Sequence, residues 1–214
     1  APLVERGFLR IAYGEADGGS QLAAHPSVTH VHLTGTRETH DKLVWGLFGA
    51  QREARKASGE PLLKKPVTSA LGSVTPFLVM PFLYAKDELW YQARSVVTQI
   101  VDNASFTCHA AKMLVLPKGW PQRELFLSMI KDALGKVPPR FPFHPGAENR
   151  HALLTAGRER LFCAGGLLQT GMLPWTVIEA LDPTDADEPL FRTEPFCGLV
   201  SEVSVLSLIH ISEP

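Results

Sequence analysis

Strand-like and helix-like segments alternate along this chain, and the alternation restricts its fold more than any other feature of the sequence. His30–Thr34 has the pattern of a strand that ends at Gly35, and Glu38–Ala57 has the pattern of a helix interrupted near Gly46 and Gly49. Strands separated by helices are typical of a sheet with parallel strands. We therefore predict an α/β fold.

The rest of the chain continues this pattern. We expect extended segments at Gly7–Tyr13, Val67–Val79, Lys112–Leu116, Trp175–Ile178 and Leu199–Val205. We expect helices at Ser20–His25, at Asp87–Asp102, after Pro121 and at Ala147–Ala156.

Two of these helices have a clear apolar face. In the helix that Asp87 is expected to cap, the apolar positions are Leu89, Ala93, Val96, Val97 and Ile100. In the helix that Pro121 is expected to open, they are Leu125, Met129, Ile130 and Ala133. Each set falls at helical spacing, so we expect each set to face a core.

The composition excludes several classes of protein. The chain has 214 residues, 45% of them hydrophobic and 20% charged, with a formal net charge of -1. These values are ordinary for a globular protein, and because there is no basic excess we expect no nucleic-acid partner. The most apolar run, Ala70–Ala85, is broken by two prolines and is shorter than the roughly 20 residues of a membrane helix, so we expect no membrane contact.

Cysteine and histidine spacing gives no sign of a metal site. The three cysteines, Cys108, Cys163 and Cys197, cannot all pair with one another and match no zinc motif. His30 and His32 share a strand face but lack a third ligand. We therefore expect no bound metal and a reducing, cytoplasmic location.

Both ends of the sequence look unlike those of a complete protein. The chain begins at Ala1 rather than at Met, so we expect a fragment. Residues 206–214, L-S-L-I-H-I-S-E-P, fit no pattern before them, and we expect them to be a non-native tail.

Four short segments carry a family resemblance. They read L-T-G-T-R-E at 33–38, K-P-V-T-S-A-L-G-S-V-T-P at 65–76, N-A-S-F-T-C-H-A-A-K at 103–112 and T-E-P-F-C-G at 193–198. In this order they resemble the aldehyde dehydrogenase superfamily. The resemblance implies a three-layer αβα fold. Residues 1–72 would be the C-terminal half of a Rossmann-type NAD(P)-binding domain, and residues 73–205 would be part of the catalytic domain.

The resemblance also implies a mechanism and a set of site residues. Cys108 would be the nucleophile whose thiolate adds to an aldehyde, so that hydride passes to NAD or NADP and a thioester remains. Gly35 and Thr36 lie where a strand is followed by a helix, which suits a pyrophosphate. The resemblance implies a cofactor site formed by Gly35, Thr36, Leu71, Glu194 and Phe196. We expect a small-molecule aldehyde as substrate and a homo-oligomer for the full-length protein.

The sequence departs from the family pattern at several positions. Ala70 stands where the general-base Glu that activates the hydrolytic water is expected. Three explanations remain open: transfer of the acyl group to a thiol such as coenzyme A, a weakened or inactive homologue, or an altered copy of the sequence. Ser105 and Phe106 replace the usual Gly-Gln before the cysteine, and His40 replaces a glycine.

Two residues that the family uses in catalysis and in cofactor binding have no counterpart in this sequence. The upstream Asn of the oxyanion hole and the Lys that binds the cofactor ribose have no matching segment in this sequence. Because losing one oxyanion-hole donor costs about a hundredfold to a thousandfold in rate, we expect the isolated chain to be close to inert.

Two alternatives to a dehydrogenase were considered. A Cys-His hydrolase built on Cys108 and His109 is disfavoured because successive side chains of a strand point to opposite faces. A non-catalytic relative that keeps the fold as a binding or structural protein stays open, with Ala70 as its best evidence.

Overall fold

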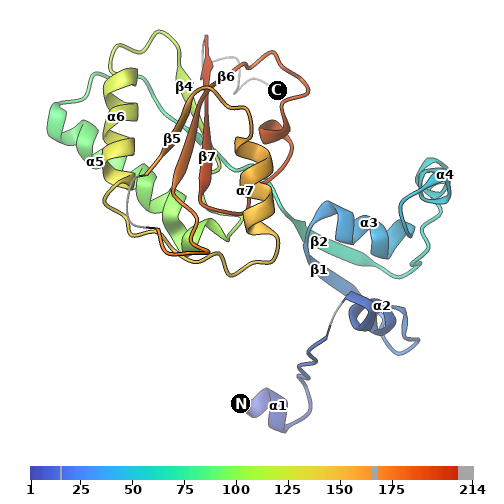
Figure 1. Cartoon of the computed structure of the whole chain (residues 1–214). Helices are drawn as coiled ribbons and strands as arrows, with labels where there is room; N and C mark the ends of the chain where they lie inside the picture. The colour runs from blue at the N-terminus through green and yellow to red at the C-terminus, as the bar shows by residue number, and fades with distance from the viewer. Residues whose placement is uncertain (15, 165–167, 207–214) are drawn as a thin grey trace. The chain divides into compact units, whose positions relative to one another are not determined.

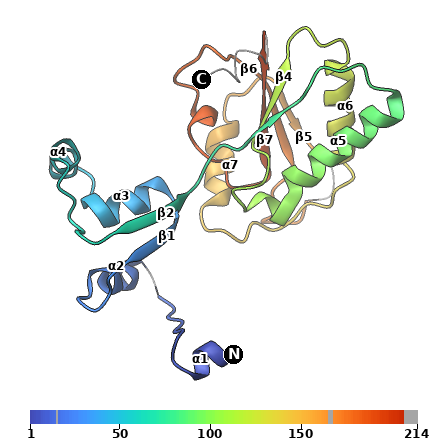
Figure 2. The ribbon, with the colours of Figure 1, turned by 180° about the vertical axis from the view of Figure 1, so that it is seen from behind.

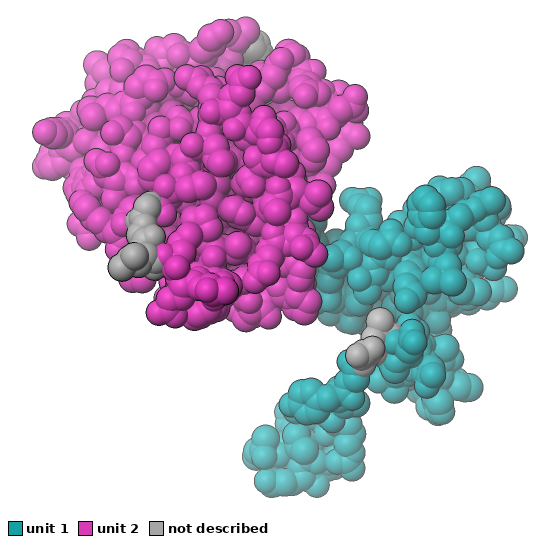
Figure 3. Space-filling view, in the orientation of Figure 1, with its two compact units in different colours: residues 1–72 teal, residues 73–214 magenta. Residues whose placement is uncertain are grey.

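The computed structural model describes residues 1–14, 16–164 and 168–206. The chain divides into two compact units, residues 1–72 and residues 73–214, which Figure 3 shows in different colours. The assignment of these stretches to a cofactor domain and a catalytic domain stays a prediction. Of the expected tail, only Leu206 falls within the described residues.

The first unit contains a two-stranded parallel sheet. Its helices are α1 (Pro2–Glu5), α2 (Ala16–Ala24), α3 (Arg37–Trp45) and α4 (Ala50–Ser58). Its strands, β1 (Val31–Gly35) and β2 (Val67–Leu71), pair in parallel over their whole length. Helices α2 and α3 lie on opposite sides of this sheet (Figures 1 and 2).

The predicted interruption between α3 and α4 is confirmed. Gly46 has a φ of 100° and Gly49 a φ of 135°. Residues with a Cβ atom rarely adopt such values, so the two glycines allow the chain to leave α3 and enter α4.

The strand predicted at Gly7–Tyr13 is wrong. These residues form no strand, and Phe8, Ile11 and Tyr13 are exposed. Alternating apolar residues form a strand only where a neighbouring strand supplies hydrogen bonds and a core covers one face. Neither is available to this segment within the described residues.

The second unit contains a five-stranded sheet with the order β3-β4-β7-β6-β5. The strands are β3 (Pro76–Leu78), β4 (Met113–Pro117), β5 (Leu161–Cys163), β6 (Thr176–Leu181) and β7 (Leu199–Val205). Neighbouring strands are parallel except β5 and β6, which are antiparallel. The sequence did not predict β5, because three residues are too few to show a period.

Helices cover both faces of this sheet. Figures 1 and 2 show α5 (Lys86–Val101) and α6 (Arg123–Leu134) on one face and α7 (Ala147–Thr155) on the other. Short 3₁₀ turns occur at Asp102–Ser105 and Pro189–Phe191. The predicted α/β class is confirmed, and the second unit has the expected three layers.

The core of the second unit lies between these layers. All five predicted positions of α5 are buried, and every residue of β4 is buried. In α6 the core side chains are centred on Phe126 and Ile130, whereas Leu125 lies at the edge of the stripe and is 47% exposed. The prediction for Leu125 is therefore wrong.

Both predicted helix starts also need correction. Helix α5 begins at Lys86, and Glu88 rather than Asp87 caps it by accepting a hydrogen bond from the Ala85 N–H at 2.9 Å. Helix α6 begins two residues after Pro121, because the chain from Pro117 to Arg123 first makes tight turns around Trp120.

Candidate active site

Four of the expected site residues lie at one end of the sheet of the first unit. Gly35 and Leu71 are the last residues of β1 and β2 and are register partners, and Ala70 pairs with Thr34. Thr36 follows β1 directly as the N-cap of α3. The carboxyl ends of parallel strands meet at one edge, and open α/β sheets bind ligands at that edge.

The turn from β1 into α3 is suited to an anion. A Cβ atom added at Gly35 would meet only the Cβ atom of Thr39, 4.0 Å away, so nothing in the chain itself requires a glycine there. The Thr36 hydroxyl accepts a hydrogen bond from the Thr39 N–H at 3.1 Å, and Arg37 adds an exposed cation. The first N–H groups of a helix lack partners inside it. Together these features fit the pyrophosphate of a dinucleotide.

The other three expected site residues lie on two loops of the second unit. Cys108 is on the loop between α5 and β4, and Glu194 and Phe196 are on the loop before β7. Strands β4 and β7 are adjacent and parallel, so the loops that lead into them meet at one edge of the sheet. The rings of Phe106 and Phe196 touch across these loops, with centroids 5.6 Å apart.

The chain approaches Cys108 through a left-handed turn. Asn103, Ala104 and Ser105 have φ values of 47°, 55° and 65°. For residues with a Cβ atom this conformation costs roughly 1–2 kcal/mol each, less for Asn. The superfamily that the sequence resembles has glycine at the position of Ser105. This chain therefore keeps a backbone conformation that suits glycine while it carries a serine side chain.

The side chain of Cys108 is exposed, and a hydrogen bond to its backbone holds the residue in place. The Thr75 hydroxyl donates a hydrogen bond to the Cys108 carbonyl oxygen at 2.5 Å. Cys163 is also exposed, whereas Cys197 is fully buried, and burial raises the pKa of the Cys197 thiol to about 11. Cys108 is thus accessible to a small molecule, and Cys197 is not.

The structure contradicts the geometric objection to a Cys-His pair. Cys108 and His109 lie in a turn rather than in a strand, and the distance from Cys108 Sγ to His109 Nδ1 is 3.7 Å. The rule that successive side chains diverge applies to extended backbone only. His109 can therefore accept the thiol proton. The Thr107 hydroxyl, 3.5 Å away, contacts the same ring nitrogen, so it does not fix the imidazole from its other side.

Lys112 is a buried cation beside this loop. It has no exposed surface, and its Nζ donates hydrogen bonds to the carbonyl oxygen of Ser105 and, at 2.7 Å, to the Ser105 hydroxyl. Burial lowers the pKa of Lys112 to about 8, while the negative charges of Glu194, Cys197 and Cys108 act in the opposite direction. The ammonium group thus belongs to the same cluster as the nucleophile candidate.

Arg150 of α7 holds the loop that carries Glu194 and Phe196. Its Nε donates to the Pro195 carbonyl oxygen at 3.0 Å and one of its terminal nitrogens donates to the Phe196 carbonyl oxygen at 3.2 Å. Burial raises the pKa of Glu194, and the charges of Lys112 and Arg150 lower it. The buried Oε1 of Glu194 has no hydrogen-bond partner among the described residues. Such an atom can receive a donor from a ligand.

Sequence reasoning missed three residues of this cluster. His109 was rejected on strand geometry, and Lys112 was taken only as the start of a strand. The signal for Lys112 was a single charge at the head of the apolar run M-L-V-L, which is unusual for a buried strand. Arg150 gave no signal, because nothing in the sequence shows that α7 faces the Pro195–Phe196 segment.

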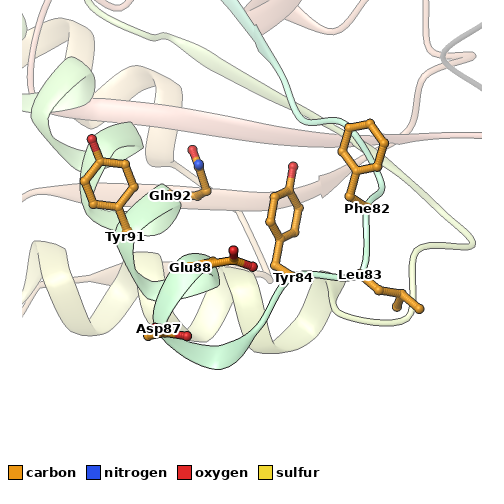
Figure 4. Close-up of a pocket in the computed structure, with 7 residues that line it drawn as sticks. All are labelled: Phe82, Leu83, Tyr84, Asp87, Glu88, Tyr91 and Gln92. Atoms are coloured by element: carbon orange, nitrogen blue, oxygen red, sulfur yellow. The ribbon is translucent and has the colours of Figure 1, made fainter.

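Two of the surface hollows in the second unit are large. One, of about 300 Å³, is formed by the loop 142–149, whose Phe143 and His144 rings pack on Phe106 and Phe196 beside the candidate site. The other, of about 500 Å³, lies at the start of α5 and includes none of the expected site residues (Figure 4). We attach no chemistry to it, because its aromatic and acidic side chains are open to solvent.

The described part of the chain contains neither a metal-binding cluster nor a membrane-spanning helix. No three His, Cys, Asp or Glu side chains there are close enough together to hold a metal ion. None of the described helices combines the length and the apolar character needed to cross a membrane.

Comparison with known proteins gives a consistent picture of the fold. No protein-family model and no curated protein matches the chain. Among solved structures, an NAD-dependent aldehyde dehydrogenase from Sinorhizobium meliloti matches 92% of this chain and 38% of its own, with 23% identity and a TM-score of 0.68. An NADP-dependent glyceraldehyde-3-phosphate dehydrogenase from Bacillus halodurans, complexed with NADP, matches 96% of this chain and 42% of its own, with 16% identity and a TM-score of 0.71.

A third match shows the same extent. Gamma-glutamyl-gamma-aminobutyraldehyde dehydrogenase from Burkholderia cenocepacia covers 92% of this chain and 39% of its own, with 21% identity and a TM-score of 0.68. The chain therefore spans about two fifths of the length of these structures. The expected fold is confirmed: this chain has the fold of the aldehyde dehydrogenases over most of its length.

Proposed function

We propose that this chain is part of an NAD(P)-dependent, aldehyde dehydrogenase-like oxidoreductase in which Cys108 is the nucleophile. The observation that carries the proposal is the position of Cys108: an exposed thiol on the loop between α5 and β4, next to the loop that holds Glu194 and Phe196. The shared fold supports the proposal, since the similar solved structures are named as aldehyde dehydrogenases.

The residues of the chain supply the parts of the reaction around the thiol. His109 Nδ1, 3.7 Å from Cys108 Sγ, accepts the thiol proton, and the thiolate then adds to the aldehyde carbon. A bound NAD(P)⁺ would supply the hydride acceptor, and loss of hydride from that carbon would leave the acyl group on Cys108 as a thioester. Addition of the thiolate is needed because it makes the aldehyde carbon tetrahedral. Hydride can then leave from that carbon as the C=O bond re-forms.

Two groups of residues would hold the cofactor. The turn at Gly35 and Thr36 offers N–H groups and an open backbone to the pyrophosphate, with Leu71 at the adjacent strand end. Glu194 offers a buried carboxylate oxygen that lacks a partner, which suits a ribose hydroxyl, and Phe196 offers an apolar ring.

The family resemblance puts Ala70 at the position of the base that would hydrolyse the thioester. A methyl group cannot take a proton from water, and general-base assistance is worth about a hundredfold to ten-thousandfold. The thioester on Cys108 should therefore hydrolyse slowly. A thiol such as coenzyme A could release it without that base.

The test is a transient measurement of NAD(P)H with an aldehyde on the full-length protein, because the isolated chain is expected to be close to inert. We expect a burst of about one NAD(P)H per site followed by slow turnover, because only the step after hydride transfer lacks its base. Fast turnover in water without added thiol would contradict the role given to Ala70. Loss of the burst in Cys108→Ser is the matched control.

The same assay separates the explanations for Ala70. Relief of the slow phase by coenzyme A would indicate acyl transfer, and relief by Ala70→Glu would indicate a damaged hydrolytic enzyme. The second candidate function, a non-catalytic protein that keeps the fold, is favoured by Ala70 alone. It predicts cofactor or aldehyde binding without any burst.

A further inference from the structure

Lys112 occupies a position that packing alone does not explain. Its side chain is fully buried at the amino end of β4, where the rest of the strand is apolar. Burying an ammonium group costs several kcal/mol unless it is paired and hydrogen-bonded. A methionine would fill a similar volume at lower cost, so the charge itself needs a reason.

The hydrogen bonds of Lys112 go to the turn that leads to Cys108. Both acceptors belong to Ser105, the last residue of the left-handed turn Asn103–Ser105. Three consecutive residues in this conformation are strained, and they persist only where surrounding contacts fix them. The two bonds from Lys112 Nζ fix the end of the turn, three residues before Cys108.

The charged groups that face Lys112 come from three elements. Cys108 lies on its own loop, Glu194 and Cys197 lie on the loop before β7, and Arg150 of α7 acts on both members of that second loop. Cys197 is fully buried and its pKa is raised to about 11, so its thiol is neutral at ordinary pH. Glu194 and a Cys108 thiolate are the two groups whose negative charge Lys112 can balance.

We propose that Lys112 is a positioning residue for Cys108: its ammonium group holds the left-handed turn and supplies the positive charge of the site in which the thiolate forms. The inference rests on the proposed role of Cys108 as nucleophile. Lys112 would act on the reaction through Cys108 without contacting the aldehyde. This role would explain why an ammonium group is buried at this position.

The experiment measures iodoacetamide labelling of individual cysteines by mass spectrometry. Cys163, exposed in the same chain, is the internal standard, and labelling of buried Cys197 reports unfolding. At about pH 6.5 we expect Lys112→Met to slow the labelling of Cys108 about tenfold relative to Cys163, the effect of roughly one pKa unit of lost charge stabilisation. Lys112→Arg, which keeps the charge, should restore most of the rate.

The pH dependence of the Cys108 labelling rate separates an effect of the Lys112 charge from an effect of its packing. Because the pKa of Lys112 is lowered to about 8, its charge is present below that pH and lost above it. The difference between wild type and Lys112→Met should therefore be full at about pH 6.5 and vanish by about pH 9.5. A difference that is the same at both pH values would assign Lys112 a structural role only, and equal rates throughout would overturn the proposal.

Two outcomes have further meaning. If Lys112→Met exposes Cys197 to labelling, Lys112→Gln, which keeps a donor for Ser105 and loses the charge, replaces it with the same expectation. Labelling needs neither aldehyde nor cofactor. A charge-dependent labelling rate without any NAD(P)H burst would support the role of Lys112 and contradict the proposed dehydrogenase function. An NAD(P)H burst that depends on Cys108, together with a labelling rate that Lys112→Met leaves unchanged, would support the dehydrogenase function and contradict the role of Lys112.

Discussion

The two units of this chain differ in how much core each possesses. The second unit buries most of β4, β6 and β7 together with one face each of α5 and α6. The first unit buries few side chains, Val44 and Arg52 among them, and its two-stranded sheet leaves Leu47, Phe48 and Leu62 exposed. A two-stranded sheet is marginally stable by itself.

This difference matters for the candidate residues of each unit. The Cys108 loop and the Glu194–Phe196 loop lie at one edge of the five-stranded sheet and are held by hydrogen bonds from Lys112 and Arg150. The Gly35–Thr36 turn lies on a small sheet with little core. We infer that contacts within the second unit hold the loops around Cys108 in place, whereas the Gly35–Thr36 turn has little core beneath it.

Amide hydrogen exchange should show the largest contrast between the units. We expect the amides of β4 and β7, such as Leu114 and Val203, to exchange on the order of a thousandfold or more slowly than that of Leu33 in β1. Core strands open only with global unfolding, and a small sheet opens locally. Similar protection in both sheets would contradict the comparison.

Truncation of matched apolar side chains should give the next largest effect. Ile130→Ala removes a fully buried side chain of α6 and should lower the free energy of unfolding by about 2–5 kcal/mol. Leu33→Ala, at a half-buried position of β1, should cost less than about 1 kcal/mol. Urea unfolding followed by circular dichroism measures both. Equal costs would mean that the first unit has a core comparable with that of the second.

Lys112 should make the stability of the second unit depend on pH. Its pKa falls from 10.5 to about 8 on folding, so between these values the unfolded chain binds more protons and stability rises with pH. Lys112→Met removes this dependence. The stability difference between variant and wild type should therefore change by about 3 kcal/mol from pH 7 to pH 10.5.

The thiol of Cys197 has the opposite effect on stability. Its pKa is raised from 9.0 to about 11, mainly by burial, which lowers stability as pH rises through that window. Subtraction of the two curves removes the part that comes from burial, whereas the smaller part that comes from the charge of Lys112 stays in the difference. A difference curve that is flat with pH would show that Lys112 keeps its ordinary pKa, and would remove the electrostatic support for its role.

The smallest predicted effect concerns a strained residue at the irregularity between β6 and β7. Ala180 is exposed and has a φ of 56°. Ala180→Gly should raise the free energy of unfolding by about 1 kcal/mol, because glycine adopts this conformation without strain. The matched control, Ala152→Gly at an exposed position of α7, should lower it by about 1 kcal/mol. Destabilisation by both changes, measured by thermal unfolding, would contradict the strain.

Much of the fold was predictable because the spacing of apolar residues and the positions of glycine and proline indicate the same elements along the chain. The buried face of α5 and the break at Gly46 and Gly49 follow from local spacing alone. The strand predicted at Gly7–Tyr13 failed because pairing depends on a partner strand, which local sequence does not show. The prediction for Leu125 failed because the buried stripe of α6 also includes Phe126, Leu127 and Leu134, which leaves Leu125 at its edge.

The candidate site was less predictable than the fold. Cys108, Glu194 and Phe196 came from the family resemblance, and their roles stay predictions. The prediction for His109 was wrong because the backbone at Cys108 and His109 is a turn rather than a strand. Lys112 and Arg150 reach the Cys108 and Glu194 loops because β4 pairs with β7 and because α7 packs against the second loop. Both are tertiary contacts, which local sequence does not show.

The central claim, that Cys108 is a reactive nucleophile on a loop held by contacts of the second unit, can be tested with an activated ester. Incubation with 4-nitrophenyl acetate, followed by peptide mapping, measures where an acetyl group is attached and how long it stays. We predict acetylation of Cys108 well before Cys163, a long-lived acetyl thioester because Ala70 supplies no base, and no such adduct in Cys108→Ser. Acetylation of Cys163 first, or no acetylation of Cys108 at all, would contradict the account.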